Sequence, residues 1–65
     1  MQKLYNNIKR FRNEYKLTQQ ELAEKAGYKD KSMIAKIEKG LVDLPYSKII
    51  LFAKIFSVTP SKLIE

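Results

Sequence analysis

The spacing of apolar residues along the chain predicts helices. Near the N-terminus, apolar residues recur every three or four positions, which predicts a helix from about Gln2 to Glu14. A second, more hydrophobic stretch predicts a helix from about Tyr46 to Phe56, which we expect to form the main wall of the core. The first stripe consists of Leu4, Ile8, Phe11 and Tyr15, and the second of Ile49, Ile50, Phe52, Ala53 and Phe56.

Between these stretches, residues 18–26 predict a short helix with a start signal and a stop signal. Thr18 and Glu21 form the T-x-x-E pattern of a capping box, in which each side chain binds a free N–H group of the other residue. Gly27 follows Ala26 and is the residue expected where a helix ends in a left-handed conformation. Because T-x-x-E is common, on its own it indicates only a capped amphipathic helix.

A second short helix is predicted from about Asp30 to Lys39, after a tight turn. Asp30 is the expected N-cap, and Lys29 or Ser32 are the alternative starting points. The residues expected to face inward are Ile34 and Ile37, with Met33 partly buried and Gly40 ending the helix.

The rest of the chain predicts a loop and one more helix. Residues 41–44 are expected to form the loop, and Thr59 and Pro60 to be the N-cap and first residue of a last short helix. We expect one compact all-α domain of five helices over residues 1–65, either a minimal protein or the N-terminal piece of a longer one. In the last helix, Leu63 is expected inside and Ile64 outside.

The amount and distribution of charge on the chain indicate which kinds of partner it could bind. The formal net charge is +6 and the pI is about 9.7, which is compatible with a nucleic-acid partner and also with a solubilising surface. Positive charge is concentrated on the first helix and on the second helix of the pair, whereas the helix between them is acidic. A solvated surface usually mixes both signs, but the outer face of the second helix is positive. That face consists of Lys31, Ser32, Ala35, Lys36 and Lys39.

The chain contains no His and no Cys, so most metal sites and most nucleophile–base pairs lack their side chains. No two of its 7 acidic residues are placed for joint acid–base work. We therefore expect no enzyme activity, no metal, no cofactor and no small-molecule substrate. No apolar run is long enough to cross a membrane, and the lack of Cys fits a reducing compartment, so we expect a cytoplasmic protein without a membrane partner.

Taken together, these motifs resemble the phage-repressor and Cro type of helix-turn-helix, also called the XRE family. The resemblance rests on four motifs and covers nearly the whole chain. The segment from Gly27 to Gly40, together with D-L-P at residues 43–45 and S-K-I at residues 47–49, looks most like the N-terminal domains of repressors from temperate phages and prophages of low-GC Gram-positive bacteria. The motifs are T-Q-x-E-L-A from Thr18 to Ala23, A-G at Ala26 and Gly27, I-x-x-I-E-x-G from Ile34 to Gly40, and A-K-x-F-x-V-T-P-x-x-L from Ala53 to Leu63.

The resemblance implies a lambda-repressor-like fold, with the helix-turn-helix formed by the second and third helices. It also implies a sequence-specific transcriptional regulator that binds double-stranded DNA through the major groove. Such a protein would be a repressor, binding a palindromic operator as a homodimer at the nucleoid of a bacterial or phage-infected cell. The alternative is a protein-interaction module of the same fold, such as an antitoxin-like or adaptor domain.

The resemblance also implies roles for individual residues. The turn has one residue more than the commonest family pattern, near Lys29 and Asp30, which leaves the register of the recognition helix open by one residue. The residues implied to face bases are Lys31, Ser32, Ala35 and Lys36. Those implied to lie along phosphates are Gln19, Lys29, Lys39, Leu41, Val42 and Asp43, and the implied structural ion pair is Arg12 with Glu38.

Overall fold

The computed structural model describes residues 2–65, and this part of the chain has five helices and no strand. The all-α class and the five helices expected from the sequence are confirmed, and the first four helices begin and end within one residue of their expected bounds. None of these helices combines the length and the apolar character that a membrane span requires. The helices are α1 (Gln2–Glu14), α2 (Gln19–Ala26), α3 (Lys31–Glu38), α4 (Tyr46–Ile55) and α5 (Pro60–Ile64).

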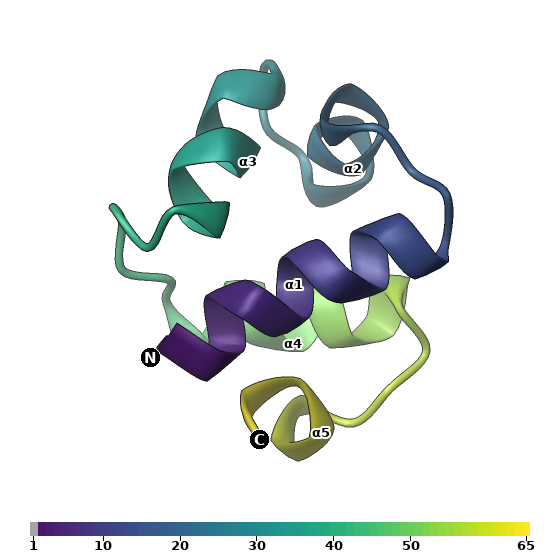
Figure 1. Cartoon of the computed structure of the whole chain (residues 1–65), viewed down its shortest axis with the longest axis vertical. Helices are drawn as coiled ribbons and strands as arrows, with labels where there is room; N and C mark the ends of the chain where they lie inside the picture. The colour runs from purple at the N-terminus through teal and green to yellow at the C-terminus, as the bar shows by residue number, and fades with distance from the viewer. Residues whose placement is uncertain (1) are drawn as a thin grey trace.

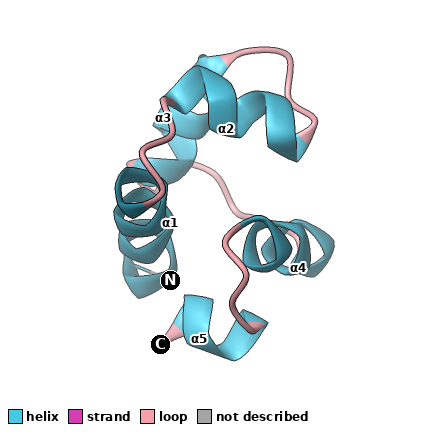
Figure 2. Cartoon of the chain, turned by 90° about the vertical axis from the view of Figure 1, so that its right-hand side faces the viewer, coloured by secondary structure: helices cyan, strands magenta, loops and turns pink. Residues whose placement is uncertain are grey.

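The helices are arranged in three levels. Figure 1 shows α2 and α3 together at one end of the molecule and α5 at the opposite end. Figure 2 shows that α1 and α4 lie between these ends, on opposite sides of the molecule. Accordingly, α3 packs against α1 and α2 packs against α4, while α5 closes the other end by packing against both α1 and α4. The pair α2–α3 is thus supported by two different helices.

The core is organised around Phe56, at the C-terminal end of α4. Its ring centroid lies 5.6 Å from that of Phe11 in α1 and 6.4 Å from that of Phe52 in α4. Such offset aromatic contacts add to the free energy gained from burial itself. Every described helix contributes at least one fully buried side chain to this core. Besides Phe52 and Phe56, the largest are Leu4, Ile8, Leu22, Ile34, Ile37 and Leu63.

The helix ends follow the local capping chemistry. The Thr18 side chain accepts from the Glu21 N–H group, and the Glu21 carboxylate accepts from the Thr18 N–H group, so the capping box is confirmed. Gly27 has a φ of 81°, the left-handed conformation expected at the end of α2. Asp30 is the N-cap of α3, which decides between the alternative starting points. Thr59 caps α5 with Pro60 in its first turn, as expected.

The expectation that Tyr15 continues the buried stripe of the first helix is wrong. Tyr15 follows the end of α1 and is 47% exposed. Its hydroxyl donates a 2.6 Å hydrogen bond to the carbonyl oxygen of Phe56, and its ring meets the Phe56 ring edge-on. The next residue, Lys16, has a φ of 57°, which turns the chain away from the helix axis. Tyr15 therefore covers the core from outside.

Three buried residues lie outside the predicted apolar pattern. Tyr5 in α1 and Leu44 in the loop before α4 belong to the core. Asn7 is also buried, and its amide donates to the carbonyl oxygens of Leu63 and Glu65 at 2.7 and 3.1 Å. Since a buried amide is tolerated where its hydrogen bonds are made, Asn7 is compatible with the core and ties α1 to α5.

Candidate nucleic-acid interface

The outer face of α3 is polar and positively charged. Lys31, Ser32 and Lys36 are exposed, and Ala35 between them is half-buried. The opposite face of α3 carries Ile34 and Ile37, which are fully buried. Lys39 is exposed and extends the outer face at the C-terminal end of the helix. The burial therefore orients α3 so that the residues expected to face bases are directed to solvent.

Asp30 organises the first turn of α3. Its Oδ1 atom accepts hydrogen bonds from both the N–H group and the hydroxyl of Ser32. These two bonds lower the pKa of the Asp30 carboxyl below its ordinary value, with a smaller contribution from the charge of Lys36. The Ser32 hydroxyl donates its hydrogen to Asp30, so in the free protein the Ser32 oxygen can bind a ligand mainly as a hydrogen-bond acceptor.

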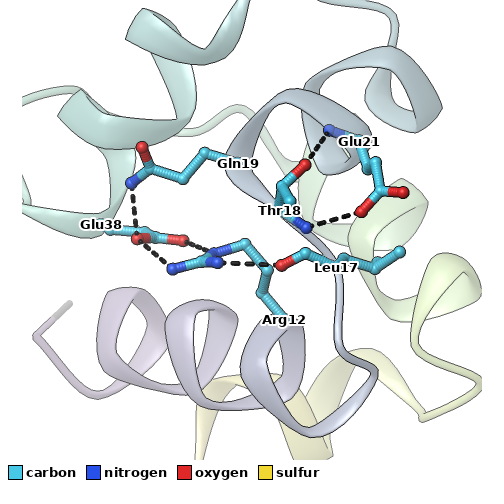
Figure 3. A network of polar contacts seen from close by, with 6 residues as sticks. All are labelled: Arg12, Leu17, Thr18, Gln19, Glu21 and Glu38. Carbon is cyan, nitrogen blue, oxygen red and sulfur yellow. Dashed lines mark hydrogen bonds and ion pairs between the residues drawn. The ribbon is translucent and has the colours of Figure 1, made fainter.

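The C-terminal end of α3 is held by a polar network around Glu38 (Figure 3). The Nε atom of Arg12 in α1 lies 2.6 Å from Glu38 Oε2, and a terminal guanidinium nitrogen lies 3.3 Å from Oε1. Arg12 also donates to the carbonyl oxygen of Leu17 at 2.9 Å. The side chains of Arg12 and Glu38 are only 12% and 5% exposed. Arg12 thus neutralises the charge of the Glu38 carboxylate, which is nearly buried and does not lie on the outer face of α3.

Gln19 joins the same network from the first turn of α2. Its Nε2 atom donates a 3.1 Å hydrogen bond to Glu38 Oε1 (Figure 3). An amide nitrogen has two hydrogens, so one hydrogen bond to Glu38 leaves the second available to an anion near the N-terminus of α2. Gln19 therefore braces α3, and its half-buried side chain is positioned beside the helix terminus where a phosphate contact was expected.

The remaining residues expected at phosphates lie in the two connections that flank α3. Lys29, in the turn before α3, is exposed. After α3, the side chain of Leu41 is 68% exposed. Its N–H group donates a 3.0 Å hydrogen bond to the carbonyl oxygen of Lys36, which caps the C-terminal end of the helix. Val42 packs partly against the core, and Asp43 is exposed. In the free protein, the Leu41 N–H group is therefore already occupied.

The contact of Lys48 with the end of α2 was not predicted from the sequence. Lys48, in the first turn of α4, donates a 2.8 Å hydrogen bond to the carbonyl oxygen of Ala26 at the end of α2. The same ammonium group lies 4.4 Å from the centroid of the Tyr28 ring, which is partly buried. That burial raises the pKa of the Tyr28 phenol above its ordinary value. No local sequence pattern links residues this far apart in the chain.

Comparison with known proteins agrees with this geometry. A family model described as helix-turn-helix matches residues 8–63, which includes the second half of α1, all of α2, α3 and α4, and α5 as far as Leu63. No curated protein and no solved structure matches the chain at a significant level.

Proposed function

Because the chain belongs to the XRE-type helix-turn-helix family, whose members are DNA-binding regulators, we propose that it is a transcriptional repressor of the phage or prophage type. It binds a palindromic operator as a homodimer, with one recognition helix in the major groove of each half-site. The half-sites are then separated by about 34 Å, one turn of DNA. Its fold, a lambda-repressor-like arrangement of five helices, presents α3 for this purpose. A repressor acts at the nucleoid, so the proposal includes a cytoplasmic location.

The observation that carries the proposal is the sign of the charge on the exposed face of α3. Glu38 would otherwise bring a carboxylate close to DNA, but Arg12 neutralises it and both side chains are nearly buried. The charges that α3 presents to solvent are those of Lys31 and Lys36, continued by Lys39. A positive face with a small residue at its centre fits the negative, sterically restricted major groove.

Each of the four residues expected to face bases has a proposed role. Lys31 and Lys36 donate to guanine O6 and N7, Ser32 accepts from a base edge, and the Ala35 methyl group contacts a thymine methyl. The proposed phosphate contacts come from the start of α2, from the turn before α3 and from the segment that follows it. These contacts involve Gln19, Lys29, Lys39 and the segment of Leu41, Val42 and Asp43.

The alternative, a protein-interaction module of the same fold, requires an apolar anchor on the outer face of α3. The exposed large apolar side chains of the described residues lie elsewhere. They are Tyr15 after α1, Leu41 in the loop after α3, Tyr46 at the start of α4 and Ile64 in α5. None of them belongs to the outer face of α3, which disfavours recognition of a protein through that face.

Selection of binding sites from random double-stranded DNA, with the full chain at near-physiological salt, tests the proposed function. An enriched palindrome is the expected result. Enrichment of a single half-site would overturn the dimer, and no enrichment over bulk DNA would overturn the repressor assignment itself.

Two double variants test whether α3 is the part of the protein that selects the binding site. The double variant Lys31→Ala with Lys36→Ala removes two charges from the outer face of α3. The double variant Lys9→Ala with Lys54→Ala removes two exposed charges from α1 and α4, so the net charge of the two proteins is equal. The α3 variant is expected to lose the enriched site, while the control variant retains it.

A further inference from the structure

The ammonium group of Lys48 lies where α2 ends. Its Nζ atom is 2.8 Å from the carbonyl oxygen of Ala26, the last residue of α2. The carbonyl groups of the last turn of a helix lack intrahelical partners, and this end of the helix dipole is negative, so a cation is stabilised there. Lys48 comes from α4, and the contact therefore connects α4 directly to the C-terminal end of α2.

The same ammonium group also holds the turn that leads into α3. It lies 4.4 Å from the centroid of the Tyr28 ring, within the range of a cation–π interaction. Between Ala26 and Tyr28 lies Gly27, in its left-handed conformation, and a Cβ atom at this glycine would be 3.9 Å from Lys48 Nζ. One cation thus contacts the residues on both sides of the glycine where the chain changes direction.

This contact lies at the end of α3 opposite the Glu38 network. Arg12 and Gln19 hold the C-terminal end of α3 through Glu38. At the N-terminal end, residues 27–30 connect the last residue of α2 to the first residue of α3. The conformation of this turn sets the direction in which α3 begins, so a contact that restrains the turn also restrains the start of α3.

We propose that Lys48 is a positioning residue, which fixes the orientation of the N-terminal half of α3 by restraining the turn at Tyr28. The inference rests on the proposed DNA binding, since the orientation of α3 matters because bases are read from it. Lys31 and Ser32 lie in the first turn of α3, close to the restraint, whereas Lys36 lies near the Glu38 network. Loss of Lys48 therefore weakens discrimination at the base pairs read by the first turn of α3 and preserves it near Lys36.

The competing explanation is that Lys48 itself contacts a DNA phosphate. Lys48 is half-buried and its ammonium group contacts Ala26 and Tyr28, so a phosphate contact would require it to leave both partners. The two explanations differ in salt dependence. Each lysine that neutralises a phosphate contributes about one unit to the slope of the logarithm of affinity against the logarithm of salt concentration, and a positioning residue contributes none.

The variant Lys48→Met keeps the apolar stem and removes the ammonium group. Lys54→Met is the matched control, because Lys54 is an exposed lysine of the same helix. We expect Lys48→Met to bind the selected operator about tenfold more weakly than the control variant, with an unchanged salt slope and unchanged affinity for unrelated DNA. A salt slope reduced by about one unit, or operator affinity equal to that of the control, would overturn the positioning role.

Amide hydrogen exchange of the free protein tests the restraint without DNA. The N–H group of Tyr28 is bonded to the carbonyl oxygen of Ala23, and that of Ser32 to the Asp30 carboxylate. In Lys48→Met both should exchange faster, while the N–H group of Leu63 in α5 is unaffected. Unchanged exchange rates at Tyr28 and Ser32 would show that Lys48 does not restrain the turn, even if the DNA-binding experiment gave the expected result.

Two further variants separate the ring from the hydroxyl of Tyr28. Tyr28→Phe retains an aromatic face beneath the ammonium group and should behave like the natural chain in both experiments. Tyr28→Leu removes the face and should resemble Lys48→Met. If the natural chain selects no DNA site, the proposed function fails, and the exchange experiment still decides whether Lys48 restrains the turn.

Discussion

Asn7 in α1 donates a 2.7 Å hydrogen bond to the carbonyl oxygen of Leu63 in α5, which joins two helices that lie at opposite ends of the sequence. The same amide reaches the carbonyl oxygen of Glu65 at 3.1 Å, and Arg10 donates to the amide oxygen of Asn7 at 3.2 Å. A single side chain thus binds one buried backbone oxygen in α5 and a second, less buried one directly after it.

The replacement Asn7→Ala is expected to lower the free energy of unfolding by about 1–3 kcal/mol, because the Leu63 carbonyl would remain buried without its donor. Urea denaturation measures this loss. Asn6→Ala is the matched control, since Asn6 is an exposed asparagine of the same helix. Equal losses in the two variants would contradict the role of the buried hydrogen bond.

Replacing Glu38 by Gln is expected to cost about 3 kcal/mol of unfolding free energy, because it leaves the nearly buried Arg12 without its counter-charge. The control is Glu14→Gln. Glu14 pairs with Arg10 at 3.8 Å, but both side chains are 54% exposed, so the expected loss is below about 0.5 kcal/mol. The two variants remove the same charge, and urea denaturation should separate them. A comparable loss in both would mean that burial does not strengthen the Arg12–Glu38 pair.

Gly27 adopts a left-handed conformation that other residues enter at a cost. Gly27→Ala is expected to destabilise the protein by about 1 kcal/mol, and Gly27→Asn by less, because asparagine tolerates this conformation better. A Cβ atom would make only an ordinary contact with Lys48, so the cost arises from the backbone and not from a clash. Thermal unfolding of the two variants checks the order, and the reverse order would contradict it.

The acid stability of the first turn of α3 should depend on Ser32. The Ser32 hydroxyl and N–H group lower the pKa of Asp30 below its ordinary 3.8 in the folded chain. A lowered folded pKa means that the ionised carboxylate stabilises the fold above the ordinary pKa, and that this contribution disappears as the pH falls through the lowered value. In Ser32→Ala the pKa of Asp30 should move up toward its ordinary value. An NMR titration of the Asp30 carboxyl measures both values, and an unchanged pKa would exclude the hydroxyl as the main cause.

Lys36 and Lys39 are both exposed, but only Lys36 is proposed to contact bases, whereas Lys39 is proposed to contact a phosphate. Lys36→Ala is expected to lose about 1–3 kcal/mol of operator affinity and to relax the preference at one base pair. Lys39→Ala is expected to weaken binding to all sequences equally and to reduce the salt slope by about one unit. Competition binding with operators altered at single positions tests both. A preference pattern unaffected by Lys36→Ala would remove that lysine from the base-reading set.

The helix boundaries were predictable because the chemistry that sets them is local. The capping box of Thr18 and Glu21, the left-handed Gly27 and the Asp30 cap each involve residues only a few positions apart in the chain. Such contacts form or fail according to the neighbouring sequence, whatever the rest of the chain does. Asp30 also decides the starting residue of α3, for which Lys29 and Ser32 were the alternatives.

The candidate interface was predictable only in part. The amphipathic pattern of α3 already separated Ile34 and Ile37 from the lysines, and the structure has them on opposite faces. The resemblance to repressors named Arg12 and Glu38 as a pair, but charge patterning alone offered several partners for each. Their near-complete burial, which gives the pair its expected strength, depends on how α1 and α3 pack.

The sequence by itself determined that the chain forms five helices, where they start and stop, and which face of α3 is apolar. Only the tertiary structure decided that Tyr15 lies outside the core, that Asn7 lies inside it, and that Lys48 holds the end of α2. Asn7 and Leu63 are 56 positions apart, Tyr15 and Phe56 are 41 apart, and Lys48 and Ala26 are 22 apart. Periodicity and capping describe neighbours along the chain, whereas these hydrogen bonds exist only after packing has brought distant backbone carbonyls within reach.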